Sequence, residues 1–405
     1  MTTRRTFLAS AMAAGAAFGN SKTFPYQEFE QRIAKKDFRD ITKDVLPTPS
    51  MVVDLDLFDK NLKTMADYAK SAPIQLRPHV KVHKSLDIAK RQVALGAIGV
   101  TTATIAESEL MSRGGIKGVL WTKQPASNNN IMRAVNLSKA DPTFMFVVDD
   151  ANVLAKVDEA AAAAKTKCRL VVAVYAGLTR QGIANGKPAV DLAQRVMAAK
   201  NVSFEGWMAY SGGASHTKGW EARRRKSVED LSGVNETVAL AKKAGLPSGI
   251  VSGGSTGTYN MDHELGLTEL ECGSYVFMDS IYRAVGGKSN GEIYTDFDNS
   301  LSIIATVDSK HHAGQATIDY GNKALIQTTD QVKGMPWMRL EKQGAEYGIL
   351  RWNDGGGETK VGDRVEIYCS NLDMSTNCYD RYYIARGNQI VDVWPIMGRS
   401  GAAQR

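Results

Sequence analysis

Residues 76–84 read Leu-Arg-Pro-His-Val-Lys-Val-His-Lys, and the interpretation of the chain starts from this stretch. As a β-strand it has a side-chain period of two, which puts Arg77, His79, Lys81 and His83 on one face. Four nitrogen-bearing side chains cannot be buried together without an anion to neutralise them. Crowding by other cations is expected to lower the pKa of Lys81, and a lysine amine without its proton is what Schiff-base chemistry requires.

Two plainer interpretations of residues 76–84 stay open at this point. An edge strand with a solvated basic face needs no anion. The His-x-Lys-x-His order also suggests a metal site, but residues 76–84 contain no cysteine or carboxylate, which disfavours one.

The composition is ordinary for a soluble globular protein. The 405 residues are 43% hydrophobic and 23% charged, enough for a large core and two domains. The formal net charge of +7 comes from scattered basic residues. The densest basic cluster, 223–226, lies beside Glu221 and Glu229 and is expected to be a solvated helix face. Since no nucleic-acid-binding motif accompanies it, we exclude a nucleic-acid partner.

The first residues have the pattern of an export signal. Residues 3–8 read Thr-Arg-Arg-Thr-Phe-Leu, and a weakly hydrophobic, alanine-rich run follows them to Gly19. That run is too short and too mild to span a bilayer permanently, so no stable membrane anchoring is expected. The pattern predicts a twin-arginine signal over 1–21 and a periplasmic protein. An ordinary basic N-terminal helix is the alternative.

Strand-like and helix-like segments alternate through the first two thirds of the chain. The expected strands are 74–81, 97–101, 118–122, 143–148, 169–175, 203–209, 249–252 and 269–272. The expected helices are 86–94, 106–113, 128–137, 151–164, 190–199 and 221–244. Eight strands with helical connections predict a (β/α)₈ TIM barrel over 45–288, with an open doubly wound sheet as the alternative.

Beyond residue 288 the pattern changes to short strands with almost no helix between them. The expected strands are 301–308, 315–319, 324–328, 347–352, 364–369, 382–386 and 389–395. We therefore predict a C-terminal all-β domain over 289–405, which the strand 50–55 could join from the other end of the chain.

Two loops rich in glycine and hydroxyl groups follow the seventh and eighth barrel strands, where such barrels often bind phosphate. Residues 252–258 read Ser-Gly-Gly-Ser-Thr-Gly-Thr, and residues 272–275 read Cys-Gly-Ser-Tyr. Each alone could be a mere turn, but together they favour a phosphate site. A lysine at one strand end and a phosphate site across the barrel are the two features expected of a binding site for pyridoxal 5′-phosphate (PLP). Lys81 would hold this cofactor as a Schiff base.

These motifs resemble the D-threonine aldolase / D-serine dehydratase family of alanine racemase-like, fold type III PLP enzymes. The resemblance is carried by residues 47–56, by 77–85 (Arg-Pro-His-Val-Lys-Val-His-Lys-Ser), by 253–258 and by 269–279 (Glu-Leu-Glu-Cys-Gly-Ser-Tyr-Val-Phe-Met-Asp). It covers about residues 45 to 400. It implies a PLP-binding barrel followed by a C-terminal β domain, and a homodimer in which the β domain of one subunit closes the partner's barrel mouth.

The resemblance also assigns candidate residues. Lys81 matches the Schiff-base lysine, and His216 matches a histidine that acts as a base near the substrate hydroxyl. A structural loop histidine is the plainer interpretation of His216. Arg180 matches an arginine near the cofactor, where it would hold a cofactor oxygen or a substrate carboxylate. The candidate cofactor-binding set is Lys81, His79, Arg180, Ser252, Gly253, Gly254, Thr256, Gly273, Ser274 and Tyr275.

The family's divalent metal site is altered in this chain. Asp373 keeps one ligand position, but Asn371 stands where the family has histidine. An amide oxygen can serve Ca²⁺, Mg²⁺ or Mn²⁺ but is a poor zinc ligand. Tyr347 and Tyr175 also stand where the family tends to have a histidine and an acid. The three changes suggest that the protein acts on a divergent substrate, or that the carbanion formed from the substrate in this family gives a different product here.

The leading functional hypothesis is a PLP-dependent lyase acting on D-configured β-hydroxy amino acids. We expect D-threonine aldolase-like cleavage to glycine and an aldehyde, with His216 taking the hydroxyl proton. The alternatives are D-serine dehydratase-like elimination, which a metal would assist as a Lewis acid, and an amino-acid racemase with Lys81 as one of two bases. From another class, the chain could be an exported protein that binds PLP or an amino acid.

Overall fold

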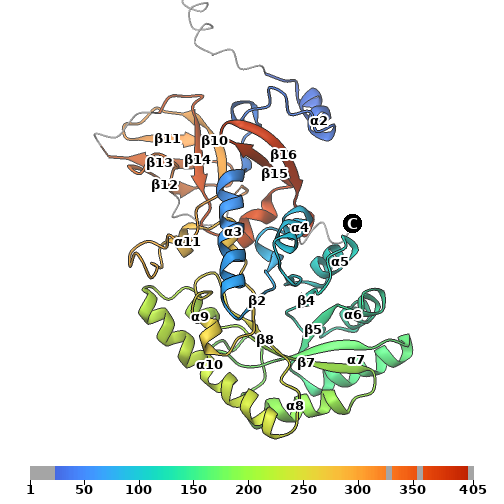
Figure 1. The fold of residues 1–405 in the computed structure, drawn as a ribbon. Coiled ribbons are helices and arrows are strands. Elements are labelled where there is room, and N and C mark those ends of the chain that lie inside the picture. The colour runs from blue at the N-terminus through green and yellow to red at the C-terminus, as the bar shows by residue number, and fades with distance from the viewer. Residues whose placement is uncertain (1–22, 325–330, 354–358, 400–405) are drawn as a thin grey trace, which may run out of the picture.

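The computed structural model describes residues 23–324, 331–353 and 359–399. These residues form two eight-stranded sheets. One is parallel and surrounded by helices, in the lower half of Figure 1, and the other lies above it. The predicted export signal over 1–21 lies outside the described residues.

The parallel sheet is the predicted barrel. Its strands are β2 (Gln75–Leu76), β3 (Thr101–Thr102), β4 (Leu120–Trp121), β5 (Met145–Val148), β6 (Cys168–Ala173), β7 (Val202–Ala209), β8 (Ile250–Gly253) and β9 (Glu269–Leu270). They pair in the order β2-β9-β8-β7-β6-β5-β4-β3. A parallel bridge between His79 and Thr101, and a 2.9 Å hydrogen bond from the Ile98 N–H to the Leu76 carbonyl, join the two ends. The sheet is therefore closed, and the open-sheet alternative is wrong.

Helices surround this barrel, and the six helices predicted between residues 86 and 244 are confirmed. They are α4 (Leu86–Ala94), α5 (Ile105–Arg113), α6 (Asn128–Ala140), α7 (Ala151–Ala164), α8 (Lys187–Ala198) and α10 (Trp220–Lys243). Local signals fix their starts. Thr104 and Glu107 form a capping box before α5, and the Asp150 carboxylate accepts the first N–H groups of α7.

The strand predicted over 74–81 is much shorter than expected. β2 ends at Leu76, and Lys81 lies in a 3₁₀ turn, η2 (Val80–Val82). Pro78 has no N–H with which to continue a ladder. The Lys81 N–H instead donates to Nδ1 of His79 at 3.3 Å, which caps the turn. The alternation of side chains therefore ends before Lys81.

The second sheet is built from both ends of the chain. Its strands are β1 (Ser50–Asp54), β10 (Leu301–Ser309), β11 (Gln315–Ile318), β12 (Met338–Gln343), β13 (Gly348–Trp352), β14 (Arg364–Tyr368), β15 (Arg381–Arg386) and β16 (Gln389–Pro395). β1 pairs antiparallel with β10 and parallel with β15, as the sequence suggested. The sequence analysis missed β12. The strand predicted over 324–328 lies almost entirely outside the described residues.

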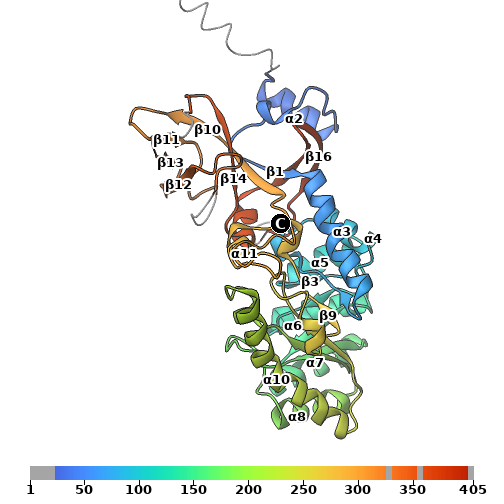
Figure 2. The same ribbon diagram turned by 60° about the vertical axis from the view of Figure 1, so that its left-hand side comes forward.

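The chain before β1 is also part of this sheet's packing. Helix α2 (Tyr26–Ala34) places Phe29 and Ile33 in a separate small core with Val52, Ile304 and Tyr383. Folded structure therefore begins before residue 45, and Figure 2 shows α2 beside β16.

The two sheets meet through aromatic packing around α3 (Leu55–Ser71). The Phe58 ring lies 5.3 Å from Trp394 of β16, and the Phe277 ring lies 5.2 Å from Tyr382 of β15, measured between centroids. These contacts hold the β domain against the C-terminal ends of the barrel strands. In the described part of the chain, no helix has the length and apolar character needed to cross a membrane.

Candidate active site

A cavity of about 400 Å³ opens at the C-terminal ends of the barrel strands. This volume is in the usual range for a small-molecule site. Among the candidates from the sequence, His79, Lys81, Arg180, Gly254, Thr256, Gly273 and Ser274 line it. The structure thus brings the lysine and both glycine/hydroxyl loops to one cavity.

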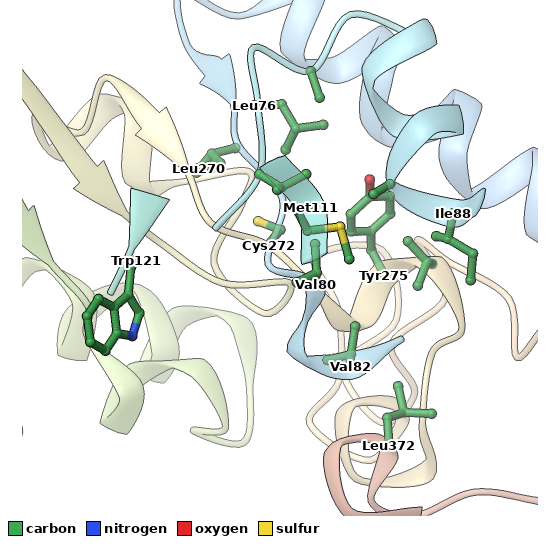
Figure 3. Packing of buried hydrophobic residues seen from close by; sticks show 14 of the residues in the cluster. Leu76, Val80, Val82, Ile88, Met111, Trp121, Leu270, Cys272, Tyr275 and Leu372 are labelled. Atoms are coloured by element: carbon green, nitrogen blue, oxygen red, sulfur yellow. The ribbon is translucent and has the colours of Figure 1, made fainter. Parts of the chain in front are cut away.

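Lys81 faces the cavity because its neighbours on either side are anchored in the core. Val80 and Val82 are buried, and Figure 3 shows them among Cys272, Tyr275 and other apolar side chains. Val80 is directed into the core and Val82 packs between the core and the cavity wall, so the η2 turn leaves Lys81 directed into the cavity.

The pKa expected for Lys81 was wrong in direction. Burial acts first and lowers the pKa, but the carboxylate of Asp373, whose Oδ2 lies 3.0 Å from Nζ, outweighs it and the pKa is raised. Asp373 belongs to α12 (Leu372–Ser375), almost 300 residues along the chain. Sequence neighbours alone could not show this anion.

The segment that carries Asp373 is tied to the lysine turn by Lys84. Its Nζ donates to Thr376 Oγ1 (2.8 Å), to the Asp373 carbonyl (2.8 Å) and to the Lys81 carbonyl. Three acceptors use the three protons of an ammonium group. The β domain is thereby locked to the barrel at the cavity.

Arg77 and His83 do not belong to the cavity. The Arg77 guanidinium forms a buried, two-pronged pair with Glu269 of β9, with Nε–Oε2 and Nη2–Oε1 distances of 2.9 and 2.6 Å. The Glu269 carboxylate thus supplies part of the negative charge that the basic side chains of residues 76–84 require. His83 is fully buried. Burial lowers its pKa to about 3, so its imidazole is neutral.

Replacing Glu269 by glutamine is expected to lower the free energy of unfolding by about 3–5 kcal/mol, because it leaves the Arg77 charge buried and unpaired. Urea unfolding monitored by circular dichroism measures the change. The matched control is Asp191→Asn, which breaks the exposed i,i+4 pair with Lys187 and should cost no more than about 0.5 kcal/mol. Equal losses of unfolding free energy in the two variants would contradict the conclusion that Glu269 neutralises a buried Arg77 charge.

His79 remains in the cavity as a neutral side chain. Its Nδ1 accepts the Lys81 N–H, and burial, followed by the nearby Lys81 charge, lowers its pKa well below the ordinary range. A neutral ring that lines the cavity and fixes the lysine turn fits a positioning role.

The loop after β8 and the turn after β9 form a cradle of Gly254, Ser255, Thr256, Gly273 and Ser274 on one side of the cavity. Gly254 has φ +76°, and a Cβ on Gly273 would lie 2.9 Å from the His79 carbonyl oxygen, so both positions need glycine. Small side chains let the backbone approach an anion closely.

Three other predicted cofactor residues, Ser252, Gly253 and Tyr275, lie behind the cradle. The Tyr275 N–H donates to Thr256 Oγ1 at 3.0 Å, and the Tyr275 hydroxyl accepts from Gln92 at 3.0 Å. Ser252 donates to Glu271 at 2.8 Å. These residues therefore support cavity-lining groups from outside the cavity.

The cradle is held by a buried acid. Asp262 accepts hydrogen bonds from Ser227 (2.6 Å) and from Thr258, which in turn accepts the Ser255 N–H at 3.1 Å. The Tyr294 hydroxyl also donates to the Thr256 carbonyl at 2.7 Å. These contacts fix the backbone of the cradle before an anion binds, and a preorganised site favours the anion because no reorganisation is needed on binding.

Glu271 is a cavity residue that the sequence analysis did not single out. It is buried just beyond β9, and burial raises its pKa to about 7, opposed by the hydrogen bond from Ser252. A carboxyl group that holds a proton near neutral pH can act as a proton donor. The signal available in the sequence was an acid two residues before Gly273, at the end of a barrel strand.

His216 lies at the edge of the site, next to the four-residue helix α9 (Gly212–Ser215). Its ring centroid is 4.5 Å from that of Tyr282, which lines the cavity. The residue is exposed, but packing around the ring lowers the pKa of the imidazole, opposed by a hydrogen bond to the Gly212 backbone. The neutral form can accept a proton.

The residues at the expected metal position do not fit a divalent ion. Asn371 Oδ1 accepts the Met374 N–H at 3.2 Å and caps α12, while the Asp373 carboxylate pairs with Lys81. Among the described residues, no three His, Cys, Asp or Glu side chains are grouped to hold a metal. Tyr347 and Tyr175 are exposed and do not line the cavity.

The cavity does fit PLP. An amine, a cradle of glycine and hydroxyl groups for a phosphate, and a buried acid surround one space of suitable size. Lys81 would hold the cofactor covalently, and Gly254, Ser255, Thr256 and Ser274 would hold its phosphate.

Comparisons with known proteins agree with this geometry. Residues 53–281 match the family described as alanine racemase, N-terminal domain, and residues 300–385 match a serine dehydratase domain. A 3-hydroxy-D-aspartate aldolase of Paracoccus denitrificans is 33% identical over 87% of this chain and 92% of its own length. A D-threonine aldolase from Arthrobacter is 29% identical with the same coverage.

Among solved structures, D-threonine aldolase from Filomicrobium marinum superposes with a TM-score of 0.83 and 31% identity, covering 89% of this chain and 97% of that one. The likeness spans both sheets, so it includes the placement of the β domain on the barrel mouth. The chain therefore belongs to the D-threonine aldolase / D-serine dehydratase family of alanine racemase-like, PLP-dependent enzymes.

Proposed function

We propose that the protein is a PLP-dependent aldolase that cleaves D-configured 3-hydroxy amino acids to glycine and an aldehyde. One observation carries the proposal: Lys81, the phosphate cradle and Glu271 line the same cavity at the barrel mouth. The relatives named above, aldolases of 3-hydroxy-D-aspartate and of D-threonine, support the reaction class.

The protein's own groups would bind and orient the reactants. When bound, PLP supplies the electron sink for the carbanion left at Cα. Lys81 would hold the cofactor, the cradle after β8 and β9 would hold its phosphate, and Glu271 would offer the proton of its buried carboxyl group to the cofactor ring. His216 accepts the proton of the substrate hydroxyl while the Cα–Cβ bond breaks to release the aldehyde. A proton returned to Cα then gives glycine.

Elimination and racemisation use the same cavity and are the competing outcomes. Elimination removes the α-proton and expels the hydroxyl, whereas racemisation needs a base on each face of the substrate. Tyr210 and Tyr282 line the cavity and are available to a racemase as the base opposite Lys81. The three chemistries give different products from the same substrate.

Product analysis on purified protein with D-threonine and D-serine is the decisive experiment. We expect glycine and acetaldehyde from D-threonine. Formation of a 2-oxo acid with ammonia would replace the proposal by a dehydratase, and formation of the L-enantiomer would replace it by a racemase. Binding of PLP without any product would leave only a binding protein.

Chelation is expected to leave this activity largely intact. Asn371 Oδ1 already accepts the Met374 N–H, and an amide in place of a histidine leaves the chain with a poor donor set for a divalent ion. Activity after EDTA dialysis, together with the metal content of the dialysed protein, measures this. Complete loss of activity that Mn²⁺, Mg²⁺ or Ca²⁺ restores would contradict it.

We also propose a periplasmic homodimer. The twin-arginine pattern in residues 3–8 supports export, and the family resemblance supports a dimer. Ile281 of α11 (Ser280–Arg283) and Met374 of α12 are exposed apolar side chains on the elements that flank the cavity, where a partner would cover them. Cell fractionation tests the location and light scattering the assembly; cytoplasmic, monomeric protein would refute both parts.

A further inference from the structure

Two cations at the mouth of the cavity have no part in the scheme above. Lys123 follows β4, and Arg180 lies in the loop after β6. Both side chains line the cavity and are exposed at its mouth. Within the three described ranges, neither of them forms an ion pair, although the Arg180 guanidinium lies 5.4 Å from the centre of the Tyr210 ring.

The loops that carry these cations are fixed to one another. Gln181, next to Arg180, donates from Nε2 to the carbonyl of Thr122, next to Lys123, at 2.8 Å. Asp149, after β5, bridges the same loops, since its N–H donates to Gln124 (3.2 Å) and its carboxylate accepts the Gly182 N–H (2.8 Å). The backbones that present Lys123 and Arg180 are therefore held side by side before any ligand binds.

The position of Lys123 separates it from the phosphate. In the closed order β2-β9-β8-β7-β6-β5-β4-β3, β4 lies diametrically opposite β8. The cradle after β8 and β9 thus lies across the cavity from Lys123. A phosphate bound in the cradle leaves Lys123 without an anion, and a substrate with one carboxylate supplies an anion for only one of the two cations.

We propose that Lys123 and Arg180 form a paired carboxylate site that selects D-3-hydroxy amino acids whose side chain ends in a second carboxylate. This inference rests on the proposed function. Arg180 takes one carboxylate, for which its planar guanidinium offers two parallel donors, and Lys123 takes the other. Because both side chains are exposed, solvent limits the gain to about tenfold in affinity for each contact.

Binding without turnover gives the first test. Titration of the PLP-loaded protein with succinate and with butyrate compares two four-carbon acids that differ by one carboxylate. We expect succinate to bind about tenfold more tightly, and Lys123→Met to remove most of that difference. Lys123→Arg should restore it. The matched control is Lys139→Met, which removes an exposed lysine near the end of α6.

Turnover gives the second test. We expect Lys123→Met to lower kcat/KM for 3-hydroxy-D-aspartate about tenfold more than for D-threonine, mainly through KM. Equal binding of succinate and butyrate by the unaltered protein, or equal losses on the two substrates, would overturn the proposal. If no hydroxy amino acid is cleaved at all, the proposed function fails, but the succinate and butyrate titrations still decide the carboxylate site.

Discussion

Lys81→Ala is expected to abolish covalent attachment of PLP and to lower kcat/KM by at least about 10³-fold, because Lys81 supplies the amine that the η2 turn directs into the cavity. The fold should survive, since the Lys81–Asp373 pair is partly exposed and such pairs contribute little to stability. The variant should bind PLP only reversibly, with loss of the visible absorbance band typical of the lysine-bound cofactor.

Borohydride reduction followed by peptide mapping makes the test independent of activity. In the unaltered protein the reduced cofactor should be found on the peptide that contains Lys81. Lys90→Ala, which removes an exposed lysine from α4, is the matched control and should retain both label and activity. Label on another lysine, or label that persists in Lys81→Ala, would refute the assignment.

Glu271→Gln is expected to lower kcat by about 10²–10⁴-fold, the usual range for loss of a proton-transferring group. Glutamine keeps a hydrogen bond but cannot hold the proton that makes the cofactor ring a strong electron sink. NMR of protein loaded with ¹⁵N-labelled PLP reports the protonation of the ring nitrogen directly. We expect a protonated nitrogen in the unaltered protein and an unprotonated one in the variant; no difference between them would exclude the role.

The same substitution should change how stability depends on pH in the protein without cofactor. The pKa of Glu271 is about 7 in the folded chain, above the ordinary value of 4.5. Between these two pH values the folded state holds a proton that the unfolded state releases. The contribution of the Glu271 carboxyl group to the free energy of unfolding is therefore fully present below about pH 4.5 and is lost as the pH rises to 7. Urea unfolding across this range should show a smaller fall in stability for Glu271→Gln.

Periodicity and turn chemistry predicted most of the fold. The helices over 86–94 and 151–164 were placed to the residue, because helical spacing and caps such as Asp150 are local properties. The two glycine/hydroxyl loops were found for the same reason. β12 was missed, since the sequence between 324 and 347 shows too little alternation of apolar and polar residues to indicate a strand.

The charges around Lys81 could not be predicted, because their partners are distant in sequence. Glu269 neutralises Arg77 from the last barrel strand, and Asp373 reaches Lys81 from the β domain. Residues 76–84 themselves contain only basic side chains, and for this reason the predicted direction of the Lys81 pKa shift was wrong. The burial of Glu271 likewise depends on how the strands close into a barrel.

The position of β1 has a consequence for how the polypeptide reaches its native state. Ser50 pairs with Ile304, and Val52 pairs with Tyr383, so the first strand to leave the ribosome must wait for partners made hundreds of residues later. Contacts of such long range slow folding. Synthesis interrupted before residue 373 leaves β1 without β15 as a neighbour and the cavity without Asp373. The β domain can therefore be completed only after β15 has been synthesised, because β1 lies between β10 and β15 in the sheet.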